Sequence, residues 1–381
     1  MQIRKHRQAA CLTLSLNGRL DMATAPTLEA ALELDGVSKI VFDLADCAYV
    51  SSAGIRVFLK SFKLMHAAGG RMELVGVSRD VREALEVTGL GKMLTIRAKA
   101  RQISIDGLEL LSAGFCGEVY RLDRESVVKL YNEGVAADLA EQEKEFAMAA
   151  FVAGIPTAIS YDVVSCGART GVVYEMLDAQ TLTKIILRNL DDMDSHARLL
   201  ADVLHTIHAV EGDPDVFPDL KTKLRSYIGM TAEFLLPADV ALLQERLARV
   251  PDAQTCVHFD IHTNNIMVRD GEPLIIDMGD LSRGSYLFDV GLLHGIYAFP
   301  ELGTCEIVTK IPNDKGAELW DGFVRHYFAR RPPEDLAFFM RNRHFFAALR
   351  LIVSSSFLPG LREITRDLLQ TVMLPGMRAA G

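Results

Sequence analysis

Residues 256–280, C-V-H-F-D-I-H-T-N-N-I-M-V-R-D-G-E-P-L-I-I-D-M-G-D, combine residue types that suit phosphoryl transfer. When a nucleoside triphosphate is the donor, one acid orients the accepting hydroxyl, while an amide and a second acid hold magnesium on the phosphates. We therefore expect Asp260 to act on the hydroxyl. Asn265 and Asp277 offer the oxygen ligands that Mg²⁺ prefers. His258 is expected to brace the loop through hydrogen bonds.

Two upstream features would place the phosphates beside this loop. The segment 109–135 is typical of three strands separated by turns, and Gly114 and Gly117 lie in its first turn. Glycines there let backbone N–H groups approach a phosphate. Lys129 lies in the third strand, where a phosphate-pairing lysine is expected. The alternatives stay open, since two glycines also make an ordinary turn and a strand lysine can face solvent.

A helix predicted within 136–157, and ended by Gly154 and Pro156, supplies an acid for this lysine. Glu141, Glu143 and Glu145 are the candidates. Glu143 lies on the apolar face of the helix, so it is the acid expected to turn toward Lys129, and Glu145 is the second choice.

The stretch 171–182, G-V-V-Y-E-M-L-D-A-Q-T-L, is typical of a strand that runs into a polar segment. In a two-lobed kinase this is the hinge, where backbone groups of residues such as Glu175 and Leu177 bind adenine. A strand and turn without a ligand explains the same residues.

Other polar residues near these motifs have simpler interpretations. Asp280 is a further metal ligand or a loop brace. Asp289 lies at a predicted helix start, where N-capping is the expected role. His205 and His208 have no evident third metal ligand, so we interpret them as packed core histidines.

Taken in order, these motifs resemble the aminoglycoside phosphotransferase and choline-kinase-like branch of the protein-kinase fold over roughly residues 108–350. The loop form H-x-D-I-H-x-x-N, the run L-H-T-I-H at 204–208 and I-D-M-G-D all favour this branch over eukaryotic-type protein kinases. The resemblance implies a bilobal domain at 108–381, with an N-lobe at about 108–178 and a C-lobe at about 179–381.

The resemblance also implies transfer of the ATP γ-phosphate to a hydroxyl of a small molecule, although some family members act on proteins. ATP and Mg²⁺ are the implied cofactors. Phe259 stands where the family usually has glycine. We expect this bulky residue to affect the acceptor side and to leave both magnesium positions intact. Residues 300–381 look helical, and the acceptor cannot be identified from them.

The first block, residues 1–100, alternates strand and helix patterns, which indicates an α/β layer domain. The whole chain is thus expected to combine an α/β and an α+β domain. Over about residues 8–98 the block resembles the STAS domain of anti-sigma-factor antagonists. This resemblance depends on G-R-L-D at 18–21, V-F-D-L at 41–44 and Y-V-S-S-A-G-I-R at 49–56.

In that family a kinase phosphorylates a serine at a helix start, and the phosphate switches binding to an anti-sigma factor. The matched acceptor is Ser52, preceded by Ser51 where the family often has Asp. A phosphate there would meet free N–H groups and the positive end of the helix dipole. The alternative is that both serines only cap the helix.

Composition restricts the class of protein. The net charge of −9 argues against a general nucleic-acid binder. The six cysteines are scattered without C-x-x-C pairs, as expected for reduced thiols. No window supplies an apolar membrane span, so we expect a cytoplasmic protein that binds neither membrane nor nucleic acid.

The leading hypothesis is an ATP- and Mg²⁺-dependent phosphotransferase for a hydroxyl group, fused to a STAS-type regulatory domain that could bind an anti-sigma-factor-like protein. One alternative is a signalling module that binds nucleotide with little or no kinase activity. Another is a kinase that acts on Ser52 of its own chain.

Overall fold

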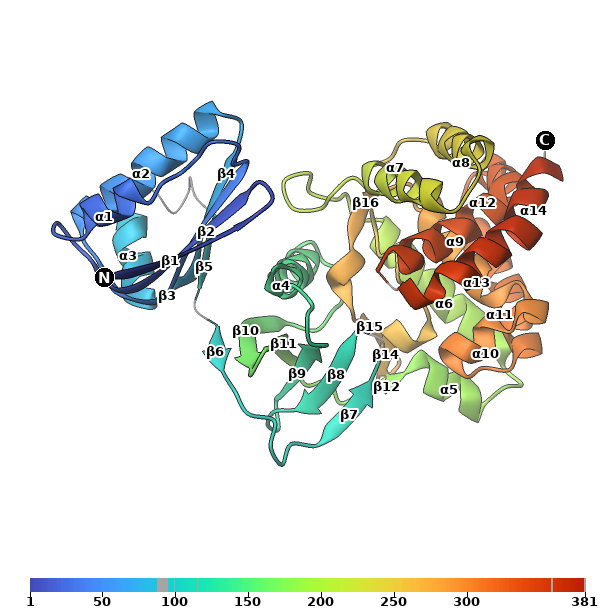
Figure 1. Ribbon diagram of the computed structural model, residues 1–381. Helices are drawn as coiled ribbons and strands as arrows, with labels where there is room; N and C mark the ends of the chain where they lie inside the picture. The colour runs from blue at the N-terminus through green and yellow to red at the C-terminus, as the bar shows by residue number, and fades with distance from the viewer. Residues whose placement is uncertain (88–94, 99, 115, 358, 380–381) are drawn as a thin grey trace. The chain divides into compact units, whose positions relative to one another are not determined.

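The structure is a computed structural model that describes residues 1–87, 95–98, 100–114, 116–357 and 359–379 (Figure 1). These residues form two compact units, Met1–Gln102 and Ile103–Gly381. Each unit has its own buried hydrophobic cluster.

The first unit is a mixed sheet covered by helices. The strands are β1 (Gln2–Gln8), β2 (Cys11–Leu20), β3 (Lys39–Val50), β4 (Arg71–Val77) and β5 (Thr95–Ala98), and the helices are α1 (Ala25–Ala30), α2 (Ser52–Ala67) and α3 (Arg79–Val87). The short β6 (Arg101–Gln102) ends the unit. In the sheet order β1-β2-β3-β4-β5, β1 is antiparallel to β2 and the other pairs are parallel.

The order of the parallel strands determines where the helices lie. Each crossover from β2 to β5 moves one strand in the same direction, and right-handed crossovers then place every helix on one face. Figure 1 shows α1, α2 and α3 on that face. Leu12, Leu14 and Leu16 alternate along β2 and are buried, so they face the helices. The sequence patterns do not indicate β1, because this edge strand is mostly polar and exposed.

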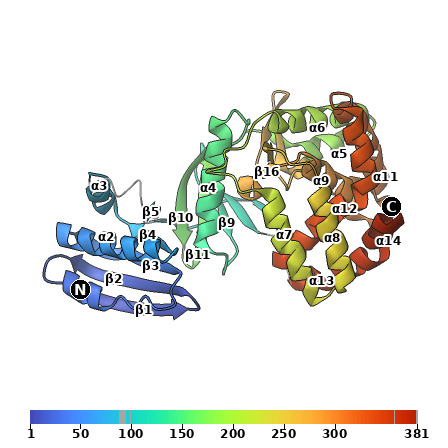
Figure 2. The same cartoon turned by 90° about the horizontal axis from the view of Figure 1, so that it is seen from above.

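The second unit begins with an antiparallel sheet. The strands are β7 (Leu110–Ala113), β8 (Gly117–Arg121), β9 (Ser126–Tyr131), β10 (Ser160–Cys166) and β11 (Arg169–Glu175), and the helix is α4 (Ala137–Val152). The strands lie in the order β10-β11-β9-β8-β7. Helix α4 packs against β10 and β11, as both views show (Figures 1 and 2).

The rest of the unit is helical and contains two small sheets. The helices are α5 (Leu182–Arg188), α6 (Met193–His208), α7 (Leu220–Met230), α8 (Pro237–Arg249), α9 (Leu287–Tyr297), α10 (Thr304–Thr309), α11 (Asn313–Phe328), α12 (Pro333–Phe357), α13 (Arg362–Leu368) and α14 (Leu374–Ala379). The strands are β12 (Gln180–Thr181), β13 (Thr255–Val257), β14 (Ile266–Arg269), β15 (Glu272–Ile275) and β16 (Ser282–Gly284).

Buried residues of α6 recur at helical spacing, as in Ala197, Leu200, Ala201 and Leu204, and this apolar stripe packs against α11. Helix α9 packs against α12. The hairpin β14–β15 pairs with β12, and the loops on either side of the hairpin hold the motif residues. Within the described residues, no helix is both long enough and apolar enough to span a bilayer.

Candidate active site

The ammonium group of Lys129 joins three elements of the second unit. It lies 2.8 and 2.9 Å from the two carboxylate oxygens of Glu143 on α4. It also lies 2.7 Å from Oδ1 of Asp277, which follows β15. The hydroxyls of Tyr131 and Tyr174 donate to the same Glu143 carboxylate, Tyr174 at 2.7 Å. Glu143 is therefore the acid that faces Lys129, as its position on the helix predicts.

These contacts determine the charges of the cluster. Burial disfavours the ammonium form of Lys129, but Asp277 and Glu143 raise its pKa well above the ordinary value. Burial acts to raise the pKa of Asp277, but the charge and hydrogen bond of Lys129 hold it below the usual range. Both groups are thus charged at neutral pH, as an ion pair that reaches from the sheet to the helical part.

The loop before β14 holds Asp260 by backbone and side-chain bonds. His258 Nε2 donates to the carbonyl of Ile276 at 3.1 Å, and His258 Nδ1 accepts from the Asp260 N–H at 3.3 Å. Asn265 Nδ2 donates to the Asp260 carbonyl at 2.8 Å. Burial raises the pKa of Asp260, and Arg350 opposes this shift. His258 is thus the brace that the sequence predicts.

Phe259 has a left-handed backbone, with φ of 58°. This conformation explains why glycine suits the position, because a side chain makes it unfavourable. The Phe259 ring is only 2% exposed and contacts Phe288 edge-on. It therefore lies in the core. Its centroid is 5.9 Å from the guanidinium carbon of Arg350.

Asp289 differs from the sequence prediction. It lies inside α9, is fully buried and does not cap the helix, whose N-cap position is Tyr286. Its carboxylate accepts from the N–H groups of His258 at 2.9 Å and Phe259 at 2.6 Å. His208 Nε2 donates to it at 3.0 Å. Because α9 is buried on all sides, an acid within it must be paired, and here it anchors the loop.

Arg350, on α12, has no motif around it and was not predicted as a site residue. Its Nη2 lies 2.6 Å from Oδ1 of Asp260, and its Nη1 lies 2.8 Å from Oδ2 of Asp280. Nη1 also donates to the Phe259 carbonyl at 3.3 Å. Asp280 is therefore a partner of this arginine.

The two glycines of the first hairpin differ in the space that a Cβ atom would have. A Cβ at Gly117 would lie 2.1 Å from the carbonyl oxygen of Leu130, so the approach of β9 requires glycine there. A Cβ at Gly114 would meet nothing closer than 3.9 Å. Packing against the described residues thus does not require glycine at this exposed position.

The predicted hinge follows β11. The N–H of Met176 donates to the Glu125 carbonyl at 2.7 Å. Leu177 is buried, and its N–H donates to no atom in the described part of the chain. Glu175 exchanges backbone and side-chain bonds with Ile159. The backbone N–H of Leu177 is thus available to a ligand.

Two oxygen donors suit a hard cation. The Asn265 amide nitrogen is used within the loop, and its Oδ1 accepts no hydrogen bond from the described residues. Asp277 uses Oδ1 for Lys129. The remaining oxygens of Asn265 and Asp277 match the preference of Mg²⁺. No group of three His, Cys, Asp or Glu side chains suited to a metal occurs among the residues described.

In the first unit, Ser52 begins α2 and Ser51 is its N-cap. The Ser51 hydroxyl accepts from the Ala53 N–H at 3.2 Å, whereas the Ser52 side chain is exposed. The capping role thus belongs to Ser51 alone.

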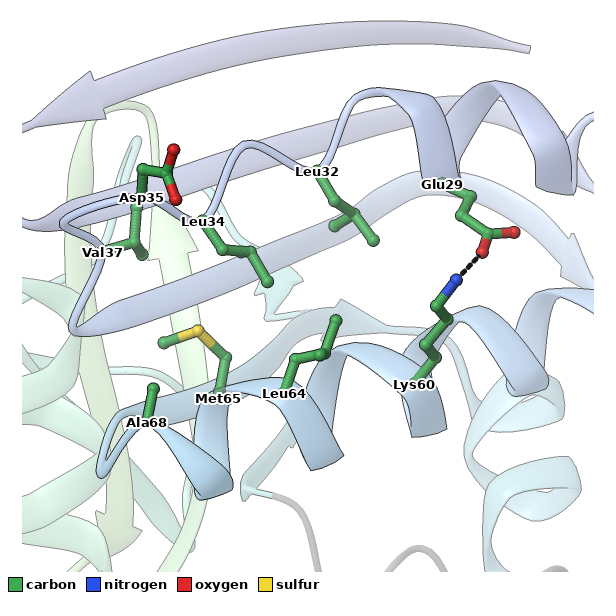
Figure 3. A pocket seen from close by; sticks show the side chains of 9 residues that line it. All are labelled: Glu29, Leu32, Leu34, Asp35, Val37, Lys60, Leu64, Met65 and Ala68. Atoms are coloured by element: carbon green, nitrogen blue, oxygen red, sulfur yellow. Dashed lines mark hydrogen bonds and ion pairs between the residues drawn. The ribbon is translucent and has the colours of Figure 1, made fainter.

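A pocket of about 380 Å³ lies between the segment after α1 and the later turns of α2 (Figure 3). Leu32, Leu34, Leu64 and Met65 line it, and an ion pair between Lys60 and Glu29 borders it. Ser52 is not among the lining residues.

Family models match both units. The STAS domain model matches residues 2–103, and the model of the phosphotransferase enzyme family matches residues 107–322. The first block is therefore a STAS domain, and the predicted pairing of this domain with a kinase-like phosphotransferase fold is confirmed.

Similar proteins agree with this division. An anti-sigma-B factor antagonist of Listeria monocytogenes is 29% identical over 96 residues, which are 24% of this chain and 84% of that protein. One of Bacillus subtilis is 28% identical over 91 residues, 23% of this chain and 84% of that protein. The solved streptomycin–ATP complex of APH(2")-IIa has a TM-score of 0.50 at 17% identity, covering 71% of this chain and 93% of that one. This last similarity concerns the fold alone.

Proposed function

Because this chain belongs to the phosphotransferase enzyme family, we propose that it is a cytoplasmic enzyme that transfers the γ-phosphate of ATP, with Mg²⁺, to a hydroxyl group of a small molecule. The observation that carries the proposal is the ion-pair cluster of Lys129, Glu143 and Asp277 beside the Asp260 loop. Lys129 supplies a fixed cation for the phosphates, and Asp260 supplies a carboxylate for the accepting hydroxyl.

In the proposed reaction the acceptor oxygen forms a bond to the γ-phosphorus, and the bond from this phosphorus to the oxygen shared with the β-phosphate breaks. ADP leaves with that oxygen, and the acceptor proton passes to the Asp260 carboxylate. Lys129 holds the phosphates, and the Leu177 N–H holds the adenine. Asn265 and Asp277 would hold Mg²⁺, which neutralises charge on the phosphates when bound.

Asp260→Asn tests this mechanism. We expect ATP consumption by the full chain to fall at least about a hundredfold, because general-base catalysis contributes that much. Calorimetry should show nearly unchanged binding of Mg²⁺ and AMP-PNP. Asp270→Asn, in the exposed β14–β15 turn, is the matched control and should keep full activity. A wild-type chain that neither consumes ATP nor phosphorylates itself would contradict the proposal.

The second candidate is a signalling module that binds nucleotide without chemistry. The STAS domain favours it, because its relatives include anti-sigma-factor antagonists. Tight Mg²⁺–AMP-PNP binding together with no ATP turnover would support this candidate over the enzyme.

We further propose that phosphorylation of Ser52 controls the binding of the STAS domain to an anti-sigma-factor-like partner. The exposed Ser52 hydroxyl lies in the first turn of α2, where free N–H groups stabilise a phosphate. Intact-mass spectrometry after incubation with ATP tests whether the chain modifies itself. A phosphate that appears on the wild type and not on Ser52→Ala supports self-modification, and an unmodified wild type leaves the reaction to a separate kinase.

A further inference from the structure

Two cations that no motif predicts lie around Asp280. Arg350 pairs with both Asp260 and Asp280. Lys223 comes from α7, and its Nζ lies 3.4 Å from Oγ of Ser282, whose hydroxyl donates to the Asp280 carbonyl at 2.9 Å. None of the described carboxylates is within ion-pair distance of Lys223. Arg350 thus binds both carboxylates, and Lys223 has no acid as an ion-pair partner among the described residues.

Asp280 interacts with both cations. Burial lowers the pKa of Lys223, Asp280 opposes that shift and Arg350 adds to it. Contacts place both cations around Asp280, because Arg350 pairs with its carboxylate and Lys223 reaches its carbonyl by way of the Ser282 hydroxyl. A carboxylate or phosphate that reached both cations would form charge-assisted hydrogen bonds with each.

The contacts of Arg350 separate it from the phosphate end of the site. Lys129 pairs with Asp277 and Glu143. Arg350 pairs with neither of these acids, and its partners are Asp260 and Asp280. It thus contacts the carboxylate that receives the acceptor proton, and not the cluster that holds the nucleotide phosphates.

We propose that Arg350 and Lys223 form an oxyanion-binding subsite, so that the acceptor is a hydroxyl compound that carries a carboxylate or phosphate group. This inference rests on the proposed function. The acidic group of the acceptor binds the guanidinium, which frees the Asp260 carboxylate for the hydroxyl. A polycationic acceptor would meet two like charges and a carboxylate that is already paired, so it is disfavoured.

Calorimetry on the full chain, saturated with Mg²⁺ and AMP-PNP, tests the subsite with four probes of one carbon skeleton: glycerate, glycerol phosphate, glycerol and aminopropanediol. We expect the two acidic probes to bind roughly ten- to a hundredfold more tightly than glycerol, since hydrogen bonds to charged groups contribute that much. Aminopropanediol should bind most weakly. A preference for glycerate over glycerol phosphate, or the reverse, identifies the acidic group.

Arg350→Met should remove the preference for acidic probes, and Arg350→Lys should keep part of it. Lys223→Met should reduce it. Arg362→Met is the matched control, because Arg362 pairs with Glu233 at the surface, and it should change nothing. Unchanged AMP-PNP binding shows that the variants fold.

Equal affinity for all four probes, no binding of the acidic probes, or a loss of AMP-PNP affinity in Arg350→Met would each overturn the subsite. The last result would assign Arg350 to the nucleotide. ATP turnover of the wild type is measured separately and tests the proposed function, so the two can fail independently.

Discussion

The carboxylate of Asp289 accepts a hydrogen bond from the backbone N–H of Phe259 at 2.6 Å, one residue before Asp260. A second bond, from the His258 N–H at 2.9 Å, reaches the other carboxylate oxygen. A single buried acid on α9 thus sets the backbone of the loop that holds the proposed base.

Replacing this acid should therefore affect both stability and chemistry. In Asp289→Ala two buried N–H groups lose their acceptor, so we expect the free energy of unfolding to fall by about 3 kcal/mol. Urea unfolding followed by the fluorescence of Trp320, the single tryptophan of the chain, measures this in the second unit. Asp194→Ala removes exposed ion pairs with Arg325 and His326, and it should change the stability much less, because solvent screens surface pairs. Equal losses in both variants would contradict the anchoring role.

Glu143 and Glu145 lie on the same helix and separate a role in the site from a general effect of charge. Glu143→Ala removes one of the two acids that hold Lys129, so the lysine is placed less firmly and Mg²⁺–AMP-PNP should bind about tenfold more weakly. Glu145 is exposed, and Glu145→Ala should bind as the wild type does. Calorimetry measures the affinity of both variants for Mg²⁺–AMP-PNP. Indistinguishable affinities would refute the assignment of Glu143.

The left-handed backbone of Phe259 predicts a reversal of the usual order of glycine and alanine. Both Phe259→Gly and Phe259→Ala lose the buried ring and should unfold more easily. The glycine variant should nevertheless be more stable by about 1 kcal/mol, because a Cβ disfavours positive φ.

Phe288 is the matched control for this comparison, because it is equally buried but lies in α9. There the alanine variant should be the more stable one by about 1 kcal/mol. Urea midpoints of the four variants measure the effect, and the same order at both positions would argue against backbone strain at Phe259.

His294 makes the second unit sensitive to acid. Its ring nitrogens have no hydrogen-bond partner among the described residues, and the rings of Phe299 and Trp320 lie within 5 Å. Burial, aided by Arg343 and His344, lowers its pKa from 6.5 to about 3. The unfolded chain thus takes up a proton below pH 6.5 that the folded chain refuses, so stability falls as the pH falls from there toward 3.

Each pH unit in this window should remove up to about 1.4 kcal/mol through this histidine. His294→Phe lacks the titrating group and should lose less stability on acidification. Urea unfolding, monitored by circular dichroism at pH values above and below 6.5, measures the difference. Wild-type and variant curves that run parallel would exclude His294 as the source.

The sequence was most informative where a role depends on near neighbours. The bracing by His258 and the choice of Glu143 over Glu145 follow from loop spacing and helical periodicity, which are local properties. The sequence suggests N-capping for Asp289 because this acid lies near a predicted helix start. In the structure it lies inside α9 and binds the loop. The uniformly apolar neighbours of Asp289 were the available signal, since a buried acid requires partners.

The sequence by itself determined the two folds, the order of the phosphate-handling motifs and the acids and amide that they contain. Only the tertiary structure placed Arg350 against Asp260 and Asp280, and Lys223 near Asp280 through Ser282. Arg350 lies 90 residues from Asp260 along the chain, and neither cation has a local pattern. Motif spacing is set by the backbone within one loop or helix. The two cations come from distant helices, and the packing of those helices decides which side chains meet.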